Sequence, residues 1–207
     1  MSQIRIRSCW LQGVAIALLA AALSNTTLAQ TNSPAKLDDA RLADAAKHPQ
    51  EWPTIGGTYD ETRFSQLDKI NVDTVKDLKL AWYGDFDTTR GQEATPLVID
   101  GVLYTSTAWS KVYAYDAKAG KQLWMFDPKV AGSKGQDACC DVVNRGLAAY
   151  DGKVYIGALD GRLIAIDMKS GKEVWSTQTT DVDRPYTITG APRIVNGKVV
   201  IGNGGPN

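Results

Sequence analysis

The chain has 207 residues, and its 23 basic and 23 acidic side chains leave a formal net charge of zero. This balance argues against a nucleic-acid-binding protein, which usually carries a basic excess. Hydrophobic residues make up 43% and charged residues 22%, so wholesale disorder is excluded. The single histidine, His48, excludes a histidine-rich zinc site, and a Ser/His/Asp triad would have to include it.

Residues 1–29 have the pattern of a secretory signal peptide. Arg5 and Arg7 precede an uncharged, mostly apolar run, and a small-residue cleavage site at 27–29 would leave Gln30 first. A membrane anchor is the alternative, but an apolar run of about 14 residues is short for a span of about 20. We therefore expect export to the periplasm and no membrane span after cleavage.

Loss of this peptide would remove Cys9 and leave two adjacent cysteines, Cys139 and Cys140. An even number of cysteines in an exported protein is expected to pair. Two buried free thiols or half of a metal site are the alternatives, although no further cysteine or nearby histidine completes a tetrahedral site.

Residues 30–51 are rich in Ala, Asp and Lys, and we expect them to form a peripheral arm with a short helix within 37–47. From residue 52 to 207 the pattern changes to short β-prone runs separated by turn residues. This second region is the predicted folded domain.

The domain contains an internal repeat. Gly101 and Gly152 are 51 positions apart, as are Trp124 and Trp175. A third unit begins near Gly197, and a preceding unit ends at residues 78–82. Repeats of 40 to 50 residues that each hold several strands indicate a β-propeller.

Each repeat has a mechanical interpretation. The Asp-Gly and Asn-Gly pairs favour type I′ hairpin turns, because both central residues of that turn need positive φ. Residues 102–104 and 154–156 are nearly all apolar, as strands buried between neighbouring sheets would be. Ala114, Asp116, Gly120 and Trp124 recur at one spacing in the next repeat. We expect the tryptophan to cover the next sheet and to have a structural role only.

Residues 82–207 provide fewer than three units, whereas a closed propeller takes about 4–8 blades. The sequence therefore predicts an all-β fold made of the first two to three blades of an incomplete β-propeller. A longer parent protein or a truncated reading frame would both explain the count.

The repeat spacing resembles the tryptophan-docking motif of the alcohol dehydrogenases that depend on pyrroloquinoline quinone (PQQ). Residues 52–65, 92–96, 137–141, 144–146 and 187–193 are also similar to segments of that family. Docking repeats alone are weak support, because non-enzymatic assembly propellers carry related ones. The adjacent cysteines and the Glu-Ala-Thr-Pro turn at 93–96 make the resemblance specific.

The resemblance implies an eight-bladed propeller and a PQQ site. It assigns cofactor contacts to Glu93, Cys139, Cys140, Arg145, Thr189, Gly205 and Pro206, and a calcium ligand to Asn207. It also implies a disulfide between the adjacent cysteines, stacked on the quinone. A guanidinium suits the carboxylates of PQQ, because its planar fork donates two parallel hydrogen bonds. Without the resemblance, Arg145 would be expected to pair with Asp141 at the surface.

The last residues depart from the family pattern. The family has Gly-Gly-Ala-Glu where this chain has Gly204-Gly205-Pro206-Asn207. Pro206 has no backbone N–H to offer the cofactor. Asn207 supplies a neutral oxygen where the family has a calcium-binding carboxylate, and calcium affinity falls with ligand charge.

The implied function is oxidation of small alcohols to aldehydes in the periplasm by hydride transfer to PQQ, with calcium as Lewis acid and a cytochrome c as electron acceptor. The chain has no Cys-x-x-Cys-His haem motif. The family's catalytic aspartate would lie downstream, so we assign no catalytic residue and expect this chain alone to be inactive. A non-enzymatic scaffold for protein assembly and an inactive product of a truncated gene are the alternatives.

Overall fold

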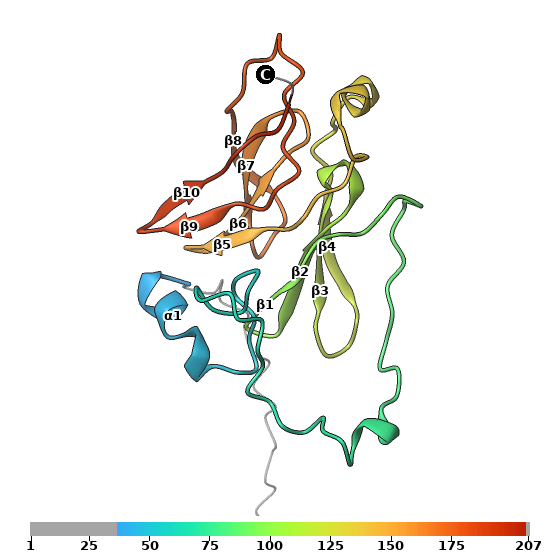
Figure 1. Cartoon of the computed structure of the whole chain (residues 1–207), viewed down its shortest axis with the longest axis vertical. Coiled ribbons are helices and arrows are strands. Elements are labelled where there is room, and N and C mark those ends of the chain that lie inside the picture. The colour runs from blue at the N-terminus through green and yellow to red at the C-terminus, as the bar shows by residue number, and fades with distance from the viewer. Residues whose placement is uncertain (1–36, 206–207) are drawn as a thin grey trace, which may run out of the picture. The chain divides into compact units, whose positions relative to one another are not determined.

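The protein was analysed as a computed structural model that describes residues 37–205 (Figure 1). The expected signal peptide, Pro206 and Asn207 lie outside the described residues. The regular secondary structure of the described part is mainly short antiparallel strands, with little helix.

The first four strands form one antiparallel sheet with the order β1-β2-β3-β4. They are β1 (Leu97–Ile99), β2 (Val102–Ser106), β3 (Val112–Asp116) and β4 (Gln122–Phe126). Asp100 and Gly101 join β1 to β2 with φ of 48° and 75°. The expected turn with two positive φ values is therefore present.

The next four strands repeat this sheet with the order β5-β6-β7-β8. They are β5 (Ala148–Tyr150), β6 (Lys153–Gly157), β7 (Arg162–Asp167) and β8 (Glu173–Gln178). A third unit has two paired strands, β9 (Arg193–Val195) and β10 (Lys198–Val200). Figure 1 shows the two four-stranded sheets in green to yellow and in orange.

Helix is confined to short pieces. Helix α1 (Asp39–Ala43) begins where the Asp38 side chain accepts a hydrogen bond from the backbone N–H of Arg41, at 3.0 Å. A single 3₁₀ turn, Ala45–Lys47, follows it. The expected short helix within 37–47 is thus confirmed, followed by one further turn. Further 3₁₀ turns lie at Val75–Asp77, Ala108–Ser110 and Gly132–Asp137.

The arm is not peripheral, contrary to the expectation from its composition. Leu37 and Leu42 are 0% and 2% exposed and belong to the same apolar core as both four-stranded sheets. The carbonyl of Leu37 accepts a hydrogen bond from Asp151 N, and Arg41 forms ion pairs with Glu51 and Asp100. Two leucines in a short charged segment give little periodic signal, so only the packing reveals their burial.

One continuous core joins the repeated sheets. The middle strands β3 and β7 contribute fully buried side chains such as Val112, Ala114, Ile164 and Ile166. Strand β8 is exposed along its whole length, and β4 is largely exposed. The sheets therefore bury their inner strands against each other, as neighbouring blades do.

Tryptophans fix the blades to one another. The Trp82 indole N–H donates to Ala117 O, and that of Trp124 donates to Met168 O, each at 3.0 Å. A Cβ built on Gly171 would lie 2.6 Å from the Trp124 ring, and Gly120 bears the same relation to Trp82. Trp82 and Trp124 thus each cover the glycine turn of the next repeat, as expected, whereas Trp175 is 37% exposed.

The segment before the first sheet departs from expectation in one respect. Residues 78–82, predicted as the end of a preceding unit, form no strand, because no strand within 37–205 pairs with them. Trp82 docks nonetheless. Asp87 also holds the segment through Lys111 Nζ at 2.6 Å and the Tyr113 hydroxyl at 2.9 Å. These two hydrogen bonds lower the pKa of Asp87.

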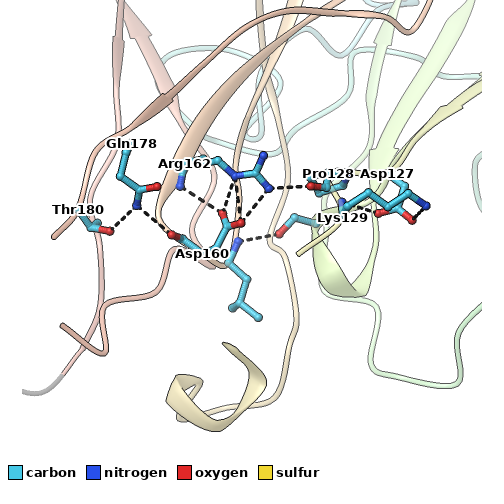
Figure 2. A network of polar contacts seen from close by, with 9 residues as sticks. Asp127, Pro128, Lys129, Asp160, Arg162, Gln178 and Thr180 are labelled. Atoms are coloured by element: carbon cyan, nitrogen blue, oxygen red, sulfur yellow. Dashed lines mark hydrogen bonds and ion pairs between the residues drawn. The ribbon is translucent and has the colours of Figure 1, made fainter. Parts of the chain in front are cut away.

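A polar network adds a second link between the two blades (Figure 2). Arg162 at the start of β7 forms an ion pair with Asp160 and donates to the carbonyl of Pro128, which follows β4, at 2.7 Å. Gln178 donates to the carbonyl of Asp160 at 3.0 Å. The start of β7 is therefore joined to the segment after β4 by a hydrogen bond as well as by the core.

We predict that Gly171→Ala destabilises the chain more than Gly101→Ala. Both glycines have left-handed backbones, with φ of 69° and 75°, so each substitution incurs about 1 kcal/mol of strain. Nothing lies within 4 Å of a Cβ at Gly101, whereas at Gly171 it meets the Trp124 ring. The clash adds about 1–3 kcal/mol, measurable by urea unfolding. Equal losses for the two variants would contradict tight docking of Trp124.

Candidate functional site

Loops from three repeat units meet around a cleft of about 400 Å³. This volume lies in the range of small-molecule sites. The lining residues are Asp137, Cys139, Cys140, Arg145, Thr187, Thr189, Gly204 and Gly205. The structure therefore brings together five of the predicted cofactor residues, namely Cys139, Cys140, Arg145, Thr189 and Gly205.

Arg145 is at the centre of this arrangement. Its guanidinium lies 3.0 Å from a carboxylate oxygen of Glu93 and donates to the Thr189 hydroxyl at 2.6 Å. Its backbone N–H donates to Thr189 O at 2.9 Å. Glu93 does not line the cleft and reaches it through Arg145. Pairing of Arg145 with Asp141 does not occur.

Asp141 instead forms an ion pair with Arg90 at 2.9 Å. It also accepts a hydrogen bond from Val142 N at 2.8 Å and has a left-handed φ of 67°. The loop that carries the cysteines is thereby fixed to the segment that carries Glu93.

The polar groups around Arg145 can rearrange for an anion. The side chains of Arg145 and Glu93 are 42% and 44% exposed, and such a pair contributes about 0–1 kcal/mol. An anionic ligand could therefore replace the carboxylate at small cost. The Thr189 oxygen accepts from Arg145, so its own O–H can donate toward the same ligand.

The disulfide expected between Cys139 and Cys140 is not formed in this structure. Both are exposed free thiols whose sulfur atoms lie side by side. Bridging neighbours in sequence closes a strained eight-membered ring, while the turn around Asp141 already places the unbonded sulfurs side by side. Hydrogen bonding to the Cys139 thiol raises the pKa of Cys140, so the reduced pair forms little thiolate near neutral pH.

Backbone pairing positions the remaining walls of the cleft. Thr95 bridges Gly146, which joins the Glu93 segment to the Arg145 turn. Thr187 and Gly204 exchange two backbone hydrogen bonds of 2.9 and 2.8 Å. Gly205 has a φ of 149°, and a Cβ there would lie 2.6 Å from the Tyr186 ring. Only glycine fits at this position, as a wall of close backbone requires.

Sequence reasoning missed two lining residues, Thr187 and Asp137. Thr187 lies two positions before Thr189, and in extended backbone such residues share a face, so alternation could have found it. Asp137 forms an ion pair with Lys134 at 2.8 Å and gave no separate signal.

Within residues 37–205, no group of three or more His, Cys, Asp and Glu side chains could hold a metal ion. No helix in this part of the chain has the length and apolar character needed to cross a membrane.

Comparison with known proteins gives a consistent match. The family model for the glucose/ethanol/alcohol dehydrogenase β-propeller domain that binds PQQ matches residues 52–205. A quinohemoprotein alcohol dehydrogenase (ADH IIB) of Pseudomonas putida is 57% identical over 83% of this chain and 25% of its own length. A 1-butanol dehydrogenase (cytochrome c) of Thauera butanivorans is 56% identical over 75% of this chain and 23% of its own length.

Solved structures agree. A quinohemoprotein alcohol dehydrogenase of Pseudomonas putida HK5 superposes with a TM-score of 0.81 at 54% identity, over 83% of this chain and 25% of that one. A europium-containing methanol dehydrogenase superposes with a TM-score of 0.76 at 39% identity, over 81% of this chain and 30% of that one. The chain thus spans about a quarter of the length of the relatives it matches. With the repeated sheets, these matches confirm the expected incomplete β-propeller.

We predict that Cys139 and Cys140 become bonded in protein recovered from an oxidising compartment, because their sulfurs are already adjacent. Trypsin releases both in one peptide, residues 135–145. Without reduction, its mass should be lower by two hydrogens than after reduction. Equal masses would show free thiols and refute the pairing.

Proposed function

The chain belongs to the PQQ-dependent (quinoprotein) alcohol dehydrogenase family, and from this premise we propose that it forms the N-terminal part of the cofactor site of a periplasmic alcohol dehydrogenase. The chain covers about a quarter of the length of its relatives, which supports a contribution to only part of the site.

One observation carries the proposal: Cys139, Cys140 and Arg145, from the segment between β4 and β5, line one cleft with Thr189, from the segment between β8 and β9. A protein scaffold without a cofactor gives no reason for an arginine, a hydroxyl and adjacent cysteines to converge. The convergence therefore favours an enzyme over a non-enzymatic scaffold.

The residues present fit PQQ, which carries three carboxylates and a flat quinone. Arg145 and Thr189 provide a cation and a hydroxyl donor for a carboxylate. The polarisable sulfurs of the cysteine pair suit contact with a flat ring. Gly204 and Gly205 allow close approach of the backbone. Glu93 pairs with this guanidinium from outside the cleft, and a carboxylate of the cofactor would take its place as the partner of Arg145.

When bound, PQQ supplies the acceptor for the hydride removed from a small alcohol as it becomes an aldehyde. The residues described here bind and orient the cofactor and shield one side of it from water. We assign none of them as the general base, and the chain alone is proposed to be inactive.

We propose calcium as the metal beside the cofactor, with Asn207 as a ligand through its side-chain oxygen and Pro206 at the cofactor. The structurally similar methanol dehydrogenase contains europium, which supports a metal at this kind of site. Calcium accepts neutral oxygen ligands, but loss of a carboxylate weakens its binding.

The proposed electron acceptor is a periplasmic cytochrome c. Support comes from the Thauera relative, whose name specifies cytochrome c. The pattern of residues 1–29 supports export. An inactive product of a truncated gene would contain the same cleft. This alternative therefore leaves the proposed binding of PQQ unchanged.

We predict that Arg145→Ala weakens PQQ binding by the chain about 10- to 100-fold, as expected for loss of a charge-assisted hydrogen bond pair. Quenching of tryptophan fluorescence during titration with PQQ and calcium measures the affinity. Arg193→Ala is the matched control. Arg193 pairs with Glu61 at 2.9 Å, and these side chains are 45% and 44% exposed, as in the Arg145–Glu93 pair. Arg193 does not line the cleft.

Arg193→Ala should leave the affinity unchanged. Equal affinities of wild type and Arg145→Ala would rule out Arg145 as a cofactor contact. Failure of the wild-type chain to bind PQQ would refute the proposed site in this chain.

A further inference from the structure

The residue before Arg145 is buried and highly connected. Asn144 is 1% exposed and does not line the cleft. Its Oδ1 accepts hydrogen bonds from the Ser106 hydroxyl at 2.6 Å and from Gly146 N at 3.1 Å. Its Nδ2 donates to Gly157 O at 3.0 Å. A single amide side chain thus links three segments of backbone.

Two of the three partners of Asn144, Ser106 and Gly157, occupy equivalent positions in the repeat. Ser106 is the last residue of β2 and Gly157 is the last residue of β6, and they are 51 positions apart. Asn144 therefore bonds the same point of both blades. A Cβ on Gly157 would lie 2.4 Å from Ile188, so glycine permits this close packing.

The third partner shapes the turn at Arg145. A hydrogen bond from Gly146 N to the Asn144 side chain is an Asx-type turn, which fixes the peptide groups between the two residues. On its other side, Arg145 N donates to Thr189 O. The backbone of Arg145 is therefore held from both sides, and its guanidinium is directed to the cleft and Thr189.

Asparagine meets these requirements because it has an acceptor and a donor on one short side chain. Aspartate would place a carboxylate against the Gly157 carbonyl. An apolar residue would leave the buried Ser106 hydroxyl and Gly146 N–H without this acceptor, which destabilises a buried site.

We infer that Asn144 is a positioning residue: through Ser106 and Gly157 it fixes the Arg145 turn to both blades, and so presents the guanidinium to the anionic cofactor. This inference rests on the proposed PQQ site for its function, but the fixed turn can be measured without any cofactor.

The test compares Asn144→Ala, Ser106→Ala and Ser110→Ala in the full chain by residue-resolved hydrogen exchange. Ser110 is the matched control, because it is also fully buried and its Oγ accepts an inter-blade hydrogen bond from Leu159 N at 3.0 Å. It has no hydrogen bond to Asn144, Arg145 or Gly146.

Asn144→Ala should speed exchange of the Arg145 and Gly146 amides at least about tenfold, since local opening loses more than one hydrogen bond. Ser106→Ala, which removes one, should speed it about fivefold. Amides of β3 and β7 should be unaffected. Ser110→Ala should leave the Arg145 turn protected. Should Asn144→Ala fail to fold, the exchange rates of the Arg145 and Gly146 amides in Ser106→Ala and Ser110→Ala decide whether Asn144 fixes the turn.

PQQ titration gives a second measurement. Ser106→Ala should weaken PQQ binding about threefold to tenfold, and Ser110→Ala should not. Unchanged exchange at Arg145 in Ser106→Ala, or equal effects of the two serine variants, would overturn the positioning role. If the wild-type chain binds no PQQ, the proposed function fails, while the exchange data still decide whether Asn144 fixes the turn.

Discussion

The structure depends on the docking of a tryptophan from one blade over the glycine turn of the next. Trp124 contacts Gly171 and donates its indole N–H to Met168 O. Trp82, from the segment before the first sheet, makes the same contact with Gly120. Because the glycines have no side chain, the rings approach the backbone directly and fix the spacing of the sheets. The continuous core between the blades then forms at that spacing.

The cleft follows from this spacing. Arg145 and Thr189 are far apart in sequence, and they meet only because successive blades stack in a fixed relation. The ion pair between Arg145 and Glu93 is too exposed to organise the site by itself. Buried backbone and amide hydrogen bonds, above all those of Asn144, hold the residues of the site in position. The exposed charges are thereby left available to a ligand.

Local features were predictable from the sequence, and features that need a partner were not. The Asp-Gly turns and the repeat follow from local backbone preferences, and the resemblance located Arg145 and Thr189. Burial of Leu37 and Leu42 was missed because it depends on sheets distant in sequence. Residues 78–82 have strand-like composition, but a strand needs a hydrogen-bonded neighbour. Thr187 was missed although it lies two positions before Thr189 and lines the same cleft.

The central claim is that segments from three repeat units form one binding surface. Its most direct test is a nuclear magnetic resonance titration of the isotope-labelled chain with PQQ and calcium. The account predicts that the amide signals of Cys140, Arg145, Thr189 and Gly204 shift together with one binding constant, while those of the exposed strands β4 and β8 stay in place. Shifts confined to one repeat unit, or shifts with unrelated binding constants, would contradict it.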